Sequence, residues 1–142
     1  MEMTLEYWNS LADQTMLISA LLGGFSIAIV ANIIVSDKNN KLTNRLLKTA
    51  TVSASCFLVS VFAMTKILMM TTEGGYLKNV TANDFLLPRI IGIATFMIGL
   101  VALSILISLS GWTKSRKTGI FTTVIGIITL LLIFVTMTEI RL

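Results

Sequence analysis

The sequence contains no histidine, and it has a single cysteine, Cys56. Without histidine, the chain lacks the side chain that most often acts as a general base or binds a metal ion near neutral pH. One cysteine excludes an intramolecular disulfide and the cysteine clusters that hold zinc. We therefore expect no metal ion and no cofactor.

Charge is also scarce, since 13% of the 142 residues are charged and 55% are hydrophobic. A soluble domain carries about a quarter charged residues. The formal net charge is +4, but the basic residues lie in short loops between apolar runs. This composition excludes a soluble enzyme and a nucleic-acid-binding module, and it indicates a protein whose main partner is the lipid bilayer.

A bilayer core about 30 Å thick requires about 20 apolar residues per helix. Four stretches qualify, at about residues 17–35, 49–70, 90–109 and 120–138. Their backbone groups must be satisfied within each segment, which favours helices, and the connections are too short to fold as domains. We predict an all-α, polytopic membrane protein in which residues 1–142 form one four-transmembrane-helix bundle. A short interfacial segment, residues 1–14, precedes the first span.

The basic residues predict the orientation, because cytoplasmic loops are enriched in lysine and arginine. Three basic residues fall on the side of the second loop and the termini. Seven fall in the first and third loops: Lys38, Lys41, Arg45, Lys48, Lys114, Arg116 and Lys117. We therefore expect the first and third loops in the cytoplasm and both termini outside. Many isoleucines and lysines with one proline are typical of a bacterial source, so the expected location is the bacterial inner membrane.

Small residues line the predicted helices at helical spacing. In the first span, Ser19, Gly23 and Ser26 share one face, and a second ridge of alanine and glycine lies beside it. Lipid provides no hydrophobic drive between helices, so small residues allow the close approach that dispersion requires. Two interpretations remain open: packing within one chain, or packing of the first helix against other copies.

Two polar residues within the spans are further candidates for pore lining or helix packing. Lys66 is the one ionisable side chain inside a span, and Asn32 lies near the inner end of the first span. The lysine stem can reach the headgroups, or the charge can face a pore. The asparagine amide can pack between helices or narrow a pore. With no embedded carboxylate and no histidine, we do not expect an enzyme.

The run from Ser19 to Ser26 (SALLGGFS) resembles the pore-helix segment of the Orai calcium-channel family over about a tenth of the chain. The resemblance implies four spans assembled with the first helices around a central pore. Asn32 stands where that family has its acidic selectivity residue. The family's basic approach to the first helix is replaced by Glu2, Glu6 and Asp13. Calcium selectivity is therefore not expected.

The sequence favours a small homo-oligomeric ion channel or membrane-perturbing effector, with the first helices near the symmetry axis. The alternative is a non-conducting anchor or sensor subunit that docks a cytoplasmic protein partner through its basic loops. Both are multi-pass proteins of the cell membrane.

Overall fold

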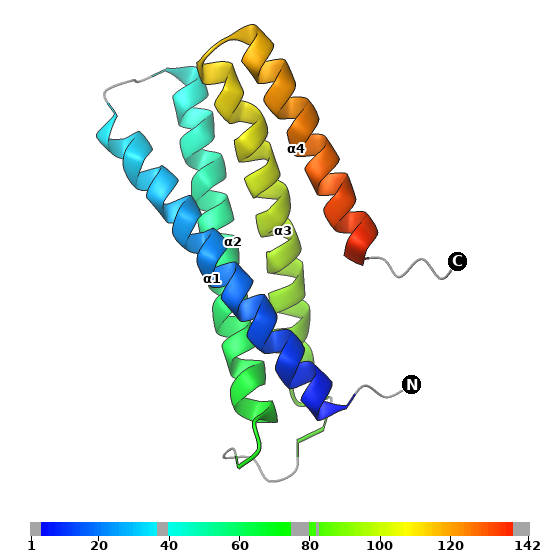
Figure 1. The fold of residues 1–142 in the computed structure, drawn as a ribbon. Coiled ribbons are helices and arrows are strands. Elements are labelled where there is room, and N and C mark those ends of the chain that lie inside the picture. Colours follow the sequence, from blue (N-terminus) through cyan, green and yellow to red (C-terminus); the bar gives the residue numbers. More distant parts are fainter. Residues whose placement is uncertain (1–3, 37–39, 75–79, 82, 138–142) are drawn as a thin grey trace.

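The structure is a computed structural model that describes residues 4–36, 40–74, 80–81 and 83–137. Within these residues the fold is all-helical (Figure 1). Its elements are α1 (Leu5–Val35), α2 (Lys41–Thr71), α3 (Leu86–Ser110), the short 3₁₀ turn η1 (Gly111–Thr113) and α4 (Arg116–Met137).

The four α-helices are each long and apolar enough to cross a membrane. Even α4, with 22 residues, is about 33 Å long at 1.5 Å per residue. The prediction of an all-α chain with four apolar spans is confirmed to this extent. The helices extend beyond the apolar stretches because polar residues begin them: the side chains of Thr4 and Asn40 cap the first turns of α1 and α2.

The expected separate segment at residues 1–14 is not separate in the part that the structure describes. From Leu5 onward its residues form the first turns of α1, which continues without a break to Val35. The capping hydroxyl of Thr4 accepts a hydrogen bond from the backbone N–H of Tyr7, and no proline interrupts the helix. Residues 1–3 lie outside the described residues.

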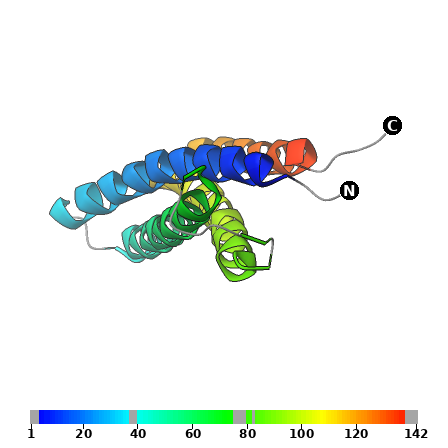
Figure 2. The same ribbon diagram turned by 90° about the horizontal axis from the view of Figure 1, so that it is seen from below.

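The helices pack mainly in chain order, α1 on α2, α2 on α3, and α3 on α4. Viewed along the helices, α1 and α4 lie on the same side of the α2–α3 pair (Figure 2). In α4 the buried residues are Gly119 and Gly126, so most of its surface is uncovered. The arrangement is an open array, because α4 packs on α3 and η1 and has little contact with α1 and α2.

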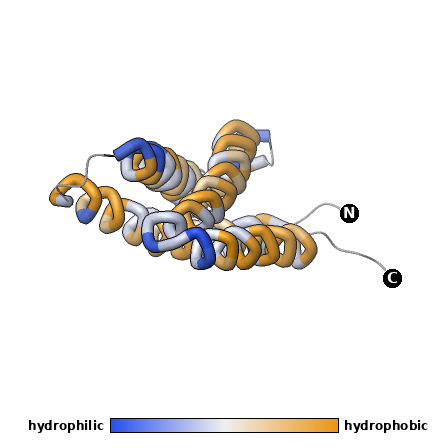
Figure 3. The backbone as a smooth tube through the Cα atoms, turned by 90° about the horizontal axis from the view of Figure 1, so that it is seen from above, coloured by the Kyte–Doolittle hydropathy of each residue, from blue (hydrophilic) through white to orange (hydrophobic). Residues whose placement is uncertain are grey.

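The two ends of the array differ in charge. The end of α1, the start of α2, the end of α3 and the start of α4 lie at one end, which we call the basic end, and hydrophilic residues gather there (Figure 3). The start of α1, the end of α2 and the start of α3 lie at the other, which we call the Trp8 end (Figure 1). After α2, Gly74 adopts a φ of 79°, a conformation that glycine accommodates without a steric penalty.

Candidate functional site

A line of buried serines joins α1 to α2. The hydroxyl of Ser19 donates to that of Ser60 across 3.2 Å, and the hydroxyls of Ser26 and Ser53 are 3.1 Å apart. All four side chains are fully buried. Hydroxyl pairs of this kind link helices in an apolar environment, where an unpaired hydroxyl is costly.

Gly23 lies between the two serines of α1 and brings the helices close. A Cβ atom added at Gly23 would lie 3.2 Å from the Cβ atom of Phe57 on α2. Ser19, Gly23 and Ser26, predicted as pore-lining or packing residues, thus face α2 of the same chain. No titratable group takes part in these serine pairs, so the pairs join helices and supply no acid or base.

The second small ridge of α1 faces away from the other helices. Ala20, Gly24 and Ala28 are exposed, and a Cβ atom added at Gly24 would meet nothing within 4 Å. Phe25, with 64% of its surface exposed, flanks this ridge. We call Ala20, Gly24 and Ala28 the outward ridge of α1.

The other two predicted candidates are also on the surface. Asn32 is exposed one helical step beyond the outward ridge, near the end of α1. Lys66 is exposed on α2 and lines a shallow groove with Phe62 and Pro88. The structure therefore separates Lys66 from the serine line and leaves Asn32 next to the outward ridge.

The basic end carries six exposed basic residues among those described: Lys41, Arg45, Lys48, Lys114, Arg116 and Lys117. Lys38, predicted with them, lies outside the described residues. The described acidic residues belong to the other end of the array: Glu6, Asp13, Glu73 and Asp84. These basic residues thus make this end of the array electropositive.

Sequence reasoning missed a cluster at the Trp8 end. The side-chain amide of Asn9 donates to the hydroxyls of Thr71 and Thr72 at 2.9 and 3.2 Å, and so ties α1 to the end of α2. The guanidinium of Arg89 lies 4.0 Å from the ring centroid of Trp8. No local sequence pattern pairs these residues, because the partners are distant in sequence.

In comparisons with known proteins, the chain matches no family model, no curated protein and no solved structure. The resemblance to the Orai pore helix therefore rests on the residues of α1 alone, and the function has to be argued from the site.

Proposed function

We propose that the chain is a multi-pass cell-membrane protein that assembles with copies of itself through the outward ridge of α1 and forms an ion-conducting pore between the copies. The four apolar helices support insertion in a bilayer. The excess of lysine and arginine at the basic end supports an orientation with that end in the cytoplasm.

The observation that carries the proposal is the uncovered state of the outward ridge. Small residues in steps of four let the backbones of two membrane helices approach closely, and Gly24 has open space where a partner helix would pack. Within one chain, the hydroxyls of Ser19 and Ser26 are hydrogen-bonded to serine hydroxyls of α2. A path for ions is therefore better sought between copies than along the serine line.

Asn32 extends the ridge by one step toward the basic end. An exposed amide at that position gains a hydrogen-bonding partner when helices of several copies meet, or it contacts water in a pore. Because an amide is neutral, it does not select for calcium as a ring of carboxylates does. The proposed pore is therefore expected to have a weak preference for cations or no preference.

Oligomeric state in lipid tests the proposal. Wild-type protein in nanodiscs is expected to contain several copies and to carry ion flux in liposomes. Gly24→Leu should reduce both, because the added side chain blocks close helix approach. Ala94→Leu, at an exposed small residue of α3, is the matched control and should leave both unchanged. A wild-type monomer in both mild detergent and nanodiscs contradicts the proposal.

A second candidate is a non-conducting anchor that binds a cytoplasmic protein, and the exposed basic residues of the basic end favour it. This function predicts no flux in liposomes from wild-type protein. It also predicts that the triple variant Lys114→Glu, Arg116→Glu, Lys117→Glu loses an acidic cytoplasmic partner while its assembly state is unchanged. The flux measurement separates the two candidates.

A further inference from the structure

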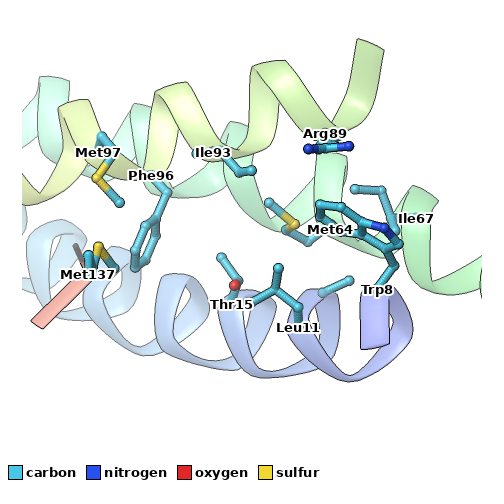
Figure 4. Close-up of a pocket in the computed structure, with 11 residues that line it drawn as sticks. Trp8, Leu11, Thr15, Met64, Ile67, Arg89, Ile93, Phe96, Met97 and Met137 are labelled. Carbon is cyan, nitrogen blue, oxygen red and sulfur yellow. The ribbon is translucent and has the colours of Figure 1, made fainter. Parts of the chain in front are cut away.

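A cavity of about 340 Å³ opens between α1 and α3 at the Trp8 end (Figure 4). α1 and α3 both pack against α2, which forms the floor of the cavity with Met64 and Ile67. Leu11 and Thr15 enter it from α1, and Ile93 enters from α3 (Figure 4). The volume falls in the range of specific small-molecule sites, at its lower end.

The cavity is apolar except at one end. Arg89 and Trp8 lie together at that end, and Phe96, Met97 and Met137 lie at the other (Figure 4). Along α3, the step from Arg89 to Met97 covers about 12 Å at 1.5 Å per residue. The cavity is thus a narrow slot that runs from the helix ends toward the middle of the array.

The guanidinium of Arg89 is held in place at the slot entrance. It stacks on the indole of Trp8 at 4.0 Å, and Trp8 is 7% exposed and packs edge-to-face against Phe85 with ring centroids 6.0 Å apart. Among the described residues, Arg89 forms no side-chain hydrogen bond and no ion pair with a carboxylate. Its five N–H donors are therefore available to an anion.

We infer that this slot binds one acyl chain of an anionic phospholipid, whose phosphate contacts Arg89. A planar guanidinium pairs with two phosphate oxygens at once, which a lysine ammonium does not do with the same geometry. Trp8 and Tyr7 are residues that membrane proteins place at headgroup level, so Arg89 lies at the depth of a lipid phosphate.

The far end of the slot suits a chain terminus. Met97 and Met137, which lie at that end, are flexible and polarizable, and such side chains adjust to ligands of varied shape (Figure 4). Thr15 is the single hydroxyl among the lining residues, and the other lining residues beyond Arg89 and Trp8 are apolar. A charged head with a long apolar tail matches this polarity, whereas a fully polar ligand does not.

Tryptophan fluorescence gives a direct test, since Trp8 lines the slot. Trp112→Phe leaves Trp8 as the only indole of the chain. This protein is placed in phosphatidylcholine nanodiscs. The nanodiscs are doped with one of two lipids that carry brominated acyl chains, either phosphatidylglycerol or phosphatidylcholine. We expect brominated phosphatidylglycerol to quench the fluorescence of Trp8 at a several-fold lower mole fraction than brominated phosphatidylcholine does. Equal quenching by the two lipids overturns the inference.

Arg89→Gln removes the charge and leaves a shorter polar side chain, and it should abolish the several-fold preference. Lys66→Gln removes an exposed cation of α2 outside the slot, and it should retain the preference. A preference that survives in Arg89→Gln overturns the assignment to a lipid held by Arg89. The assignment is also overturned if added inorganic phosphate eliminates the preference in the Trp112→Phe protein.

Filling the slot provides an independent variant that keeps Arg89. Thr15→Phe places a ring in the slot and should lower quenching by brominated phosphatidylglycerol several-fold. Leu17→Phe adds a ring on the outer surface of α1, where 61% of the leucine is exposed, and should leave quenching unchanged. Undiminished quenching in a helical, monodisperse Thr15→Phe protein overturns the inference.

Discussion

Ser26 of α1 and Ser53 of α2 hold their hydroxyl oxygens 3.1 Å apart, and neither side chain is exposed. The hydroxyl of Ser53 also lies 3.4 Å from the backbone carbonyl oxygen of Gly99 on α3. One small side chain therefore contacts polar atoms of two neighbouring helices. The central packing of the array depends on residues that are small enough for three backbones to converge.

Ser53 is expected to tolerate truncation better than enlargement. Ser53→Ala removes the interhelical hydrogen bonds to Ser26 and to the carbonyl of Gly99, each worth about 0.6 kcal/mol of unfolding free energy in membrane proteins. Ser53→Leu forces a larger side chain into a filled site and should cost about 1–3 kcal/mol. Titration with a denaturing detergent, followed by circular dichroism, measures both. Ser55→Leu, at an exposed serine of the same helix, is the control, and an equal loss there contradicts the packing argument.

Gly24 of α1 and Gly99 of α3 should respond in opposite ways to alanine. A Cβ atom added at Gly99 would lie 3.0–3.1 Å from ring atoms of Phe57, which is fully buried. Gly99→Ala should therefore lower the unfolding free energy by about 1–3 kcal/mol. Gly24→Ala meets no atom within 4 Å and should leave the stability of the single chain unchanged or raise it, because alanine favours helix. Thermal unfolding of both variants in detergent distinguishes these outcomes.

Lys66→Met is expected to leave folding, assembly and ion selectivity as they are. The side chain is exposed on α2 near the Trp8 end, and its four-carbon stem allows the ammonium to reach the headgroups. Size-exclusion chromatography and reversal potentials in planar bilayers provide the measurement. A shift of the reversal potential toward cation preference would place the charge in the conduction path instead.

The proposed orientation predicts which positions share a side of the membrane. With Cys56→Ala as background, single cysteines at Lys41 and Lys114 should react with a membrane-impermeant maleimide from the same side. A cysteine at Asn83, in the turn before α3, should react from the opposite side. Labelling of Lys41→Cys and Lys114→Cys from different sides would falsify the four-span arrangement.

The stability of the turn at the start of α3 is expected to depend on pH through the carboxylate of Asp84. One of its carboxylate oxygens accepts hydrogen bonds from the backbone N–H and the hydroxyl of Thr81, each at 2.8 Å. These bonds lower the pKa of Asp84 below its ordinary value. Their contribution to the stability of the turn is therefore present above the pKa of the unfolded chain and is lost as pH falls through the lower, folded pKa.

The amide-proton chemical shift of Thr81 reports this titration by NMR in nanodiscs. Its midpoint should lie below that of an aspartate in an unstructured peptide. Asp84→Asn should remove the transition, and a midpoint at the ordinary aspartate value contradicts the hydrogen-bonded turn.

Local sequence properties account for the four helices and for the separation of charge between the two ends. A run of about 20 apolar residues becomes a helix in a bilayer whatever surrounds it, because each helix satisfies its own backbone hydrogen bonds. The spacing of Ser19, Gly23 and Ser26 likewise predicts a packing face without knowledge of the partner. The insertion and orientation that the same residues indicate stay predictions.

Tertiary contacts decided the remainder. α1 has two small faces of similar composition, and only the packing of α2 determines that Ser19, Gly23 and Ser26 are buried while Gly24 is open. The placement of Arg89 over Trp8, and the slot beside them, depend on how three helices are rotated and spaced. Such rotations follow from the sum of many weak dispersion contacts between residues distant in sequence, and no local pattern records that sum.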